Sequence, residues 1–130
     1  MPDSLEIEGV RFTSPDRIVY PAQGISKRQL ADYYREVARW ILPRLMDRPL
    51  TLLRCPRGQE KECFAQRRAG DSIPDEVLRV EIPDPEEDEE NANHLAVDSL
   101  PGLLSLVQIG VLELHTWGSR RDRLDRPDRI

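Results

Sequence analysis

The sequence has 130 residues, of which 38% are hydrophobic and 33% are charged, and this size suits one domain with one modest core. No apolar run approaches the roughly 20 residues that a membrane-spanning helix needs, and the first residues lack the basic and apolar pattern of an export signal. The net charge of -5 comes from residues 83–93, which hold six acids and no base, since the remainder has 18 acidic against 19 basic residues. We predict a flexible acidic insert at 83–93, and the balanced remainder leaves a nucleic-acid partner open.

The first part of the chain predicts one strand and one long helix. Residues 5–12 alternate between apolar and polar side chains, which indicates a strand. Residues 13–26 are rich in turn formers. A helix is predicted to begin at Ser26, whose hydroxyl caps it, and Gln29 three positions later completes a capping box. Pro43 is predicted to end or kink this helix.

The later part of the chain alternates apolar runs with turns. The run after Ser99, with a proline in its first turn and a glycine at its end, predicts a second helix. Strands outnumber helices and helices interrupt them, so the predicted fold class is α+β, in a single domain over residues 1–130. The expected strands cover residues 48–56, 62–68, 77–82, 94–99 and 111–117, and the first two are predicted to form a hairpin joined by a polar loop.

Two cysteines and two histidines are the first candidates for metal ligands. Cys55, Cys63, His94 and His115 follow one another at spacings of 8, 31 and 21, which match no zinc pattern. Without an export signal the two cysteines are expected to be free thiols on neighbouring strands, with a disulfide as the alternative. His115 is either a hydrogen-bonded core residue or a residue that binds a phosphate or a reacting group.

Two cations near the start of the first helix predict an anion site. Arg17 lies in the turn-rich segment, and Lys27 is the first residue of the capped helix. Backbone N–H groups and the helix dipole favour an anion at such a helix start. The alternative is that both residues are solvated surface charges.

Phe64 is the candidate for contact with a nucleic-acid base. It is followed closely by Arg67 and Arg68, and an exposed aromatic beside arginines is typical of a base-stacking platform. The alternative is that Phe64 is a core residue of an alternating strand. Trp40 and Trp117 are expected to be packing residues.

Three stretches in this order resemble the N-terminal part of the polymerase domain of bacterial DNA ligase D, a member of the archaeo-eukaryotic primase superfamily that acts in non-homologous end joining. The stretches cover residues 14–58, 63–67 and 98–130. They include Pro-Asp-Arg-x-x-Tyr-Pro from Pro15 and Gln-x-Gly-Val-Leu-Glu-x-His-x-Trp from Gln108. The two motifs in this order are highly specific.

The resemblance implies the N-terminal portion of a primase-polymerase fold with an RRM-like catalytic core. The implied parent is a nucleotidyltransferase, fused to an ATP-dependent DNA ligase, that adds nucleotides to DNA 3′ ends with a divalent metal, Mn or Mg. The implied partners are double-stranded DNA ends with a 5′-phosphate, nucleoside triphosphates, Ku and the ligase domain, with no membrane. The implied location is the bacterial cytoplasm, at the nucleoid.

The resemblance also implies roles for single residues. Arg17 and Lys27 fall on the two cations that bind the 5′-phosphate, and Ser14 falls where a polar residue assists them. Phe64 falls on the first of two template-stacking aromatics, and Ala65 replaces the second, which weakens the expected stacking.

Three further positions complete the implied site. Arg54 and Arg67 are the expected additional DNA contacts. His115 falls on a histidine beside the nucleotide and metal site.

The implied catalytic core is incomplete in this sequence. The Asp-x-Asp pair that binds two metal ions in the family would follow Ile130. Asp122, Asp125 and Asp128 have a spacing of three and are not expected to replace it. We therefore expect no bound metal and no activity from the chain alone. The alternatives are a stand-alone, non-catalytic DNA-binding module and a structural module that forms a homodimer through exposed apolar surface.

Overall fold

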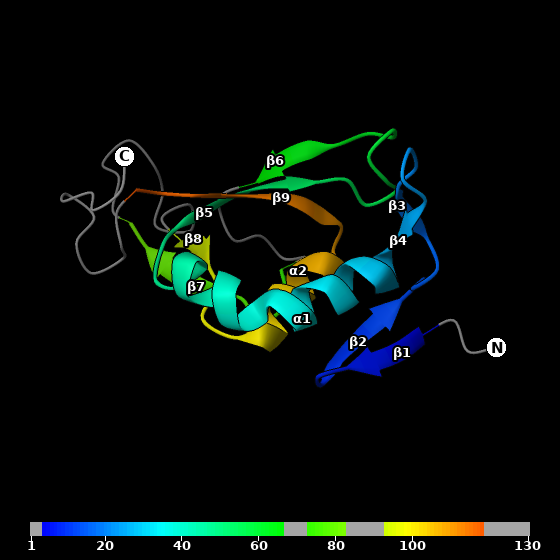
Figure 1. The fold of residues 1–130 in the computed structure, drawn as a ribbon. Helices are drawn as coiled ribbons and strands as arrows, with labels where there is room; N and C mark the ends of the chain where they lie inside the picture. Colours follow the sequence, from blue (N-terminus) through cyan, green and yellow to red (C-terminus); the bar gives the residue numbers. More distant parts are fainter. Residues whose placement is uncertain (1–3, 67–72, 83–92, 119–130) are drawn as a thin grey trace.

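The computed structural model describes residues 4–66, 73–82 and 93–118. Within them, two helices pack against a five-stranded antiparallel sheet, and two small hairpins lie at one end of the molecule (Figure 1). The predicted α+β class with two main helices is confirmed. Neither of these helices is long and apolar enough to cross a membrane. The elements are β1 (Ser4–Ile7), β2 (Val10–Thr13), β3 (Ile18–Tyr20), β4 (Ile25–Ser26), α1 (Lys27–Leu45), β5 (Leu50–Arg54), β6 (Phe64–Gln66), β7 (Leu78–Glu81), β8 (Asn93–Ala96), α2 (Leu100–Gln108) and β9 (Val111–Thr116).

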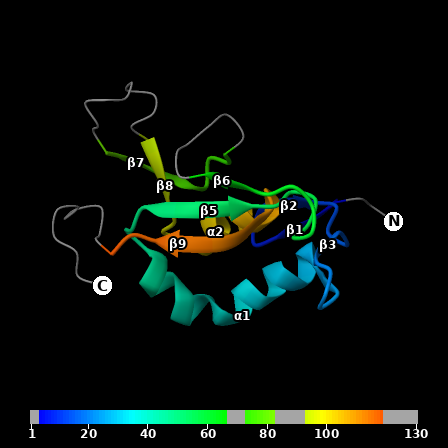
Figure 2. The same cartoon turned by 90° about the horizontal axis from the view of Figure 1, so that it is seen from above.

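The central strand of the sheet is β5. It pairs antiparallel with β6, β8 and β9, and β8 also pairs with β7. Figure 2 shows β5 and β9 side by side, with α1 along one flank. Thr51 lies opposite His115 and Leu53 lies opposite Glu113, so these four side chains share one face. Leu52 points to the other face and is fully buried, so one face packs on the helices and the other is open.

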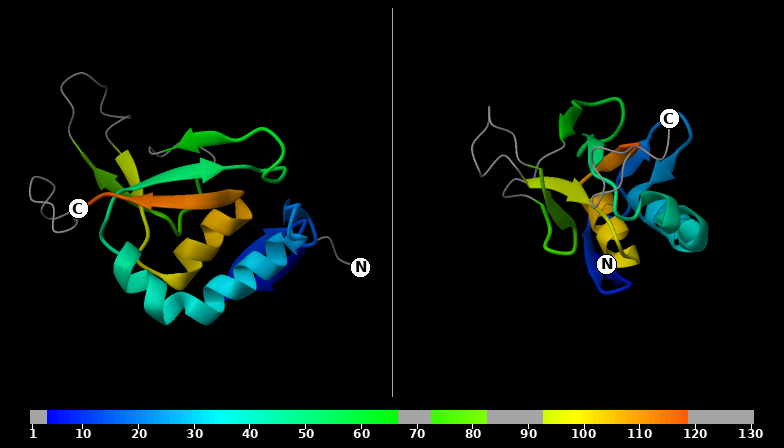
Figure 3. Two further views of the ribbon diagram at one scale, coloured as in Figure 1. Left: turned by 45° about the horizontal axis from the view of Figure 1, so that its top comes forward. Right: turned by 90° about the vertical axis from the view of Figure 1, so that its left-hand side faces the viewer.

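Helix α2 lies at the centre of the core. Its residues 102–107 are all buried, as expected for a helix that is surrounded on every side. One side of α2 packs in a cluster with Phe12 of β2, and the other side packs with Leu50 and Leu52 of β5. Figure 3 shows α2 between the sheet and α1. The core therefore fixes the end of α2 relative to both the first hairpin and the sheet.

Helix α1 begins where the sequence predicts but continues further. The Ser26 hydroxyl accepts a hydrogen bond from the Gln29 backbone N–H at 3.2 Å, and the Gln29 side chain accepts one from the Ser26 N–H at 2.8 Å. This confirms the capping box. Pro43 lies inside the helix. At the end of the helix, the N–H group of the C-cap residue Met46 donates a hydrogen bond to the Leu42 oxygen at 2.8 Å. Of the predicted end or kink at Pro43, the end is wrong, because the helix continues through Pro43 to Leu45 and the proline removes only its own N–H hydrogen bond.

Two short hairpins replace the predicted first strand and part of the irregular segment after it. Residues 5–12 include most of both β1 and β2, and the chain turns at Glu8 and Gly9, whose φ angles are 51° and 82°. Two residues with positive φ form the kind of tight turn that suits a hairpin. The single predicted strand is therefore wrong. Strands β3 and β4 form the second hairpin, and the Tyr20 hydroxyl of β3 donates to the Leu112 oxygen of β9 at 2.8 Å.

Gly110 ends α2, as the sequence predicts, and lies against the loop that follows β5. Its φ angle is 87°, which favours glycine. A Cβ atom at this position would lie 2.7 Å from the Cα atom of Pro56. The Gly110 oxygen accepts a hydrogen bond from the Cys55 N–H at 2.7 Å. The junction of α2 and β9 is therefore in direct backbone contact with the end of β5.

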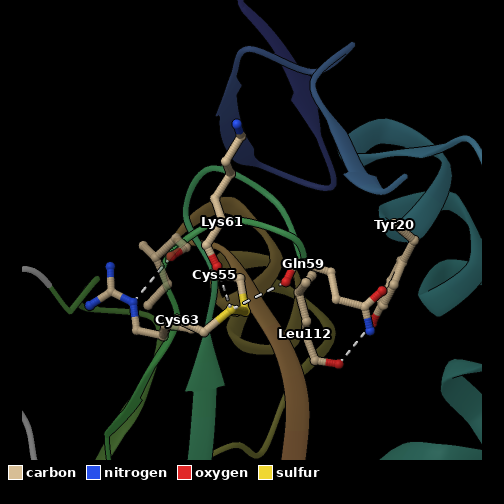
Figure 4. Close-up of a disulfide and its surroundings, with 8 residues drawn as sticks. Tyr20, Cys55, Gln59, Lys61, Cys63 and Leu112 are labelled. Atoms are coloured by element: carbon tan, nitrogen blue, oxygen red, sulfur yellow. Dashed lines mark hydrogen bonds between the residues drawn. A yellow bond between two sulfur atoms is a disulfide. The ribbon is translucent and has the colours of Figure 1, made fainter. Parts of the chain in front are cut away.

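Cys55 and Cys63 form a disulfide in this structure (Figure 4). The expectation of free thiols is therefore wrong. Arg54 and Phe64 are the last paired residues of the β5–β6 ladder, and the two cysteines come next, with Cα atoms 4.3 Å apart. The register of the hairpin thus places the two sulfur atoms within bonding reach, and the disulfide closes the loop over residues 56–62 at its base.

The two tryptophans differ in environment. Trp40 is 58% exposed, and the guanidinium carbon of Arg39 lies 4.0 Å from its ring centroid. The prediction that Trp40 is a packing residue is therefore wrong. Trp117 is half-buried, and its ring meets the His94 ring edge-on with centroids 5.7 Å apart, so the packing prediction for Trp117 is confirmed.

Candidate nucleic-acid interface

Lys27 is a buried lysine whose ammonium group is held by uncharged oxygen atoms. The residue is 3% exposed. Its Nζ atom lies 2.8 Å from the Thr13 backbone oxygen, 3.2 Å from the Gln108 backbone oxygen and 3.4 Å from Gln108 Oε1. No carboxylate of the described segments forms an ion pair with it. Because the residue is buried, the surface-charge alternative for Lys27 is wrong, and no carboxylate among the described residues compensates its positive charge.

Arg17 lies next to Lys27. The Arg17 backbone oxygen accepts a hydrogen bond from the Lys27 N–H at 2.8 Å, and the exposed guanidinium donates from Nη1 to the Pro56 oxygen at 2.8 Å. Burial first, and the charge of Arg17 second, lower the pKa of Lys27 to about 8. No carboxylate within the described part of the chain pairs with Arg17 either. The fold thus brings the two predicted cations together with an excess of positive charge, which an anion would complement.

Ser14 begins the turn that leads to Arg17. Its φ angle is 49°, and its oxygen accepts a hydrogen bond from the Arg17 N–H at 3.1 Å. The turn also covers the start of α1, because the N–H groups of Lys27 and Arg28 donate to the oxygens of Arg17 and Pro15. The argument that the first N–H groups of this helix are free to bind an anion is therefore wrong. An anion would meet the side chains of this turn instead. We call Ser14, Arg17 and Lys27 the cationic cluster.

Arg54 and Phe64 form a second group of predicted site residues. They lie opposite each other in the β5–β6 ladder, and the Arg54 guanidinium carbon is 5.1 Å from the Phe64 ring centroid. Arg54 donates to Gln66 Oε1 at 2.9 Å and to the Ile109 oxygen at 3.1 Å, and burial lowers its pKa. Phe64 is 44% exposed, so the core alternative for it is wrong. A fixed cation supports an exposed ring here, which suits base stacking.

His115 lies on the open face of the sheet. Its side chain is 64% exposed, and Nε2 is 3.0 Å from the Glu113 carboxylate. The core alternative for His115 is therefore wrong, and the imidazole is accessible to a ligand on that face. Ala65 faces the same side, since it pairs with Leu53. The predicted contact Arg67 lies outside the described residues.

The end of α2 contacts both groups of cations. Gln108 accepts hydrogen bonds from Lys27, and the Ile109 oxygen accepts one from Arg54. The last carbonyl groups of a helix have no partner within it and carry the negative end of its dipole, so cations suit this place. Sequence reasoning missed Gln108. The available signal was a glutamine at the end of an otherwise largely apolar helix.

Metal ligands do not converge in the described segments. Across residues 4–66, 73–82 and 93–118, no three side chains of His, Cys, Asp or Glu are grouped so that they could hold a metal ion. These residues therefore do not form by themselves the divalent-metal site that the resemblance implies. We assign no reaction step to a metal in this chain.

Comparison with known proteins places the chain in a family. Residues 26–130 match the family model described as LigD, primase-polymerase domain. The chain belongs to this family. It is 35% identical over 127 residues to the multifunctional non-homologous end joining protein LigD of Pseudomonas aeruginosa, and 30% identical over 129 residues to the bifunctional LigD of Bacillus subtilis. These matches cover 94% and 92% of this chain but only 14% and 20% of those proteins, so the chain spans a small part of the length of its LigD relatives.

The fold is also that of a LigD polymerase domain. The structure is similar to the polymerase domain from Mycobacterium tuberculosis Ligase D in complex with DNA, with a TM-score of 0.77 and 30% sequence identity. The match covers 85% of this chain and 38% of that one. The resemblance to the ligase D polymerase domain that the two sequence motifs indicated is therefore confirmed.

Proposed function

We propose that this chain binds the 5′-phosphorylated end of double-stranded DNA, as the N-terminal part of a LigD polymerase domain that acts in non-homologous end joining. The observation that carries the proposal is the cationic cluster, in which Arg17 and Lys27 lie together without a carboxylate partner among the described residues. The solved relative is a LigD polymerase domain in complex with DNA, which supports DNA as the ligand.

Each member of the cationic cluster has its own part in this proposal. The exposed Arg17 guanidinium binds phosphate oxygens with the N–H groups that face solvent. The buried Lys27 adds positive charge to the site. The Ser14 hydroxyl is a further hydrogen-bond donor to the phosphate. Phe64, held over Arg54, stacks on a template base, and such stacking is tolerant of base identity.

Two further residues complete the proposed DNA contacts. Arg67 follows Phe64 closely in sequence and is proposed to contact the DNA backbone. His115, on the open face of the sheet, is proposed to lie beside the nucleotide.

Binding to two matched duplexes tests the proposal. One duplex carries a 5′-phosphate and the other a 5′-hydroxyl, and fluorescence anisotropy at one fixed ionic strength gives both affinities. We expect tighter binding of the phosphorylated duplex, and a loss of about tenfold in that preference for Arg17→Ala, since one charge-assisted contact is removed. Arg11→Ala removes an exposed arginine of β2 and should leave the preference intact. An unchanged preference in Arg17→Ala would contradict the assignment of the pocket.

We infer that nucleotide addition belongs to the longer protein rather than to these 130 residues alone. The chain corresponds to 38% of the solved polymerase domain, and the resemblance implies that the metal-binding Asp-x-Asp pair follows it. Nucleoside triphosphates, a divalent metal, Ku and the ligase domain are accordingly proposed partners of that longer protein at the bacterial nucleoid. Primer extension with manganese and ribonucleotides checks this, and robust extension by the 130-residue chain would be the contrary result.

A second candidate function is self-association. Within the described segments β9 pairs with β5 on one edge only, and a free strand edge favours pairing with another chain. Light scattering of the chain would detect a homodimer, and a monomer at all concentrations would exclude this candidate.

A further inference from the structure

We propose that Gln108 is a positioning residue of the 5′-phosphate site, whose side-chain oxygen holds one hydrogen of the Lys27 ammonium until a phosphate oxygen takes its place. The inference rests on the proposed function of the cationic cluster. It concerns a residue 81 positions away from Lys27 in the chain.

The three acceptors around the Lys27 ammonium are unequal. The backbone oxygens of Thr13 and Gln108 lie 2.8 Å and 3.2 Å from Nζ, whereas Gln108 Oε1 lies 3.4 Å away. An ammonium has three hydrogens to donate, and the longest of three contacts is the weakest. The two backbone oxygens therefore keep Lys27 in place while the third hydrogen is the easiest to redirect.

The side chain of Gln108 keeps a hydrogen bond at each of its polar atoms when the Lys27 ammonium donates to another acceptor instead. Its Oε1 also accepts a hydrogen bond from the Thr13 N–H at 2.9 Å, and its Nε2 donates to the Thr13 hydroxyl at 2.8 Å. Both polar atoms of the amide thus stay bonded after the exchange, so no desolvated polar group is left without a partner. The same pair of bonds fixes Thr13, which directly precedes Ser14 of the cationic cluster.

The position of the amide suits an exchange with a ligand. Thr13 is exposed and Gln108 is half-buried, whereas Lys27 is 3% exposed, so the buried lysine is bonded to residues that reach the surface. Arg17, the exposed cation of the cluster, is near enough to Lys27 to affect its protonation. A phosphate bound by Arg17 would therefore approach the ammonium on the side that faces Arg17.

The neutrality of Gln108 is the second part of the inference. A glutamine holds the ammonium without compensating its charge, so the charge remains available to an anion. A carboxylate at the same place would form an ion pair with Lys27 and would repel a phosphate. The residue type at position 108 thus determines how strongly the Lys27 charge attracts a phosphate.

Gln108→Glu tests the inference with little change in shape. The carboxylate still accepts from the Thr13 N–H, and the Thr13 hydroxyl can donate to it. We expect the thermal unfolding midpoint to stay level or rise, while the preference for the 5′-phosphorylated duplex falls about tenfold. Gln23→Glu is the matched control, because it makes the same charge change at an exposed turn residue whose side chain forms no hydrogen bond with the described residues. A preference that survives Gln108→Glu overturns the role of Gln108.

An NMR titration of the Lys27 side chain provides a readout that needs no DNA. We expect Gln108→Glu to raise the Lys27 titration midpoint by about one pH unit or more, because an opposite charge favours the ammonium. An unchanged midpoint would overturn the inference whatever the DNA data show. A wild-type chain without any phosphate preference overturns both the proposed function and the role of Gln108, whereas a wild-type preference that Gln108→Glu retains overturns the role alone.

Discussion

The Nζ atom of Lys27 lies 3.2 Å from the backbone oxygen of Gln108, although 81 positions separate the two residues. The same ammonium also bonds to Thr13, so one positive charge joins the start of α1, the end of β2 and the end of α2. Lys27 therefore affects both the stability of the fold and its attraction for anions. These two effects can be measured separately.

Replacing Lys27 with methionine should destabilise the fold. Lys27→Met keeps a long side chain but leaves the part-buried backbone oxygens of Thr13 and Gln108 without their donor. At pH 9.5, where Lys27 with its pKa of about 8 is mostly neutral and only the hydrogen bonds are lost, we expect the free energy of unfolding to fall by about 1–3 kcal/mol, measured by urea denaturation. Lys61→Met, at an exposed lysine of the β5–β6 loop, should change it by no more than about 0.5 kcal/mol. Equal stability of Lys27→Met and the wild type would contradict this expectation.

The pKa of Lys27 predicts opposite pH trends for stability and for phosphate preference. The pKa is about 8 in the folded chain against an ordinary 10.5, so between these pH values the unfolded chain binds more protons. The contribution of Lys27 to folding stability therefore rises with pH across this window. The preference for a 5′-phosphate falls over the same window, because the ammonium loses its charge.

Denaturation and anisotropy at pH 7.5 and 9.5 measure the two trends, and Lys27→Met supplies the reference. In that variant the part of each trend that belongs to Lys27 should disappear. A phosphate preference that is constant from pH 7.5 to 9.5 in the wild type would argue against a role for the Lys27 charge.

Replacing Gly110 with alanine should disrupt the contact between α2 and the end of β5. The φ angle of 87° disfavours a Cβ atom, and that atom would lie 2.7 Å from the backbone of Pro56. We expect a loss of about 2–4 kcal/mol in the free energy of unfolding. Gly24→Ala is the control, since Gly24 also has positive φ but has nothing within 4 Å of the added atom, and it should cost about 1 kcal/mol. Similar losses in both variants would show that the contact with Pro56 is unimportant.

Reducing the disulfide should weaken the hairpin of β5 and β6. Cys55 and Cys63 are 8 positions apart, and closing so short a loop restricts the unfolded chain by about 2–3 kcal/mol. Urea denaturation with and without a thiol reductant measures this difference. The double replacement of both cysteines by serine should match the reduced wild type and show no response to reductant. Identical curves for the oxidised and reduced wild type would contradict the prediction.

Replacing Phe64 should affect binding more than stability. Phe64→Leu removes an exposed ring that rests on Arg54, and we expect a weaker affinity for DNA by about fivefold or more, as for the loss of one stacked base. Tyr33→Leu changes an aromatic on α1 that is 55% exposed and should leave the affinity unchanged. If both variants bind DNA as the wild type does, Phe64 is not part of the interface.

Local patterns predicted the elements whose signals are close together in the chain. The Ser26 and Gln29 capping box lies within one turn of helix, and Gly110 marks the end of α2 in the sequence itself. Pro43 misled the prediction of the helix end, since its effect depends on how much helix follows it. The first hairpin was missed because residues 8 and 9 interrupt the alternating pattern too briefly to signal a turn.

The environment of the candidate site residues depends on contacts between distant parts of the chain. The burial of Lys27 follows from acceptors on β2 and α2, and no spacing around residue 27 reveals them. The disulfide follows from the register of β5 against β6, which brings Cys55 opposite Cys63. Motifs thus located the candidate residues, while their exposure, partners and protonation required the fold.

Gln108 and Ile109 are consecutive residues, and their backbone oxygens hold Lys27 and Arg54 respectively. Neighbouring Cα atoms are about 3.8 Å apart across a trans peptide. The anchoring points of the two cations are therefore spaced by covalent geometry rather than by flexible packing. The two oxygens belong to adjacent peptide units, so a displacement of this short backbone segment moves both cations together, and substitutions around it should show strongly non-additive effects on the two proposed DNA contacts.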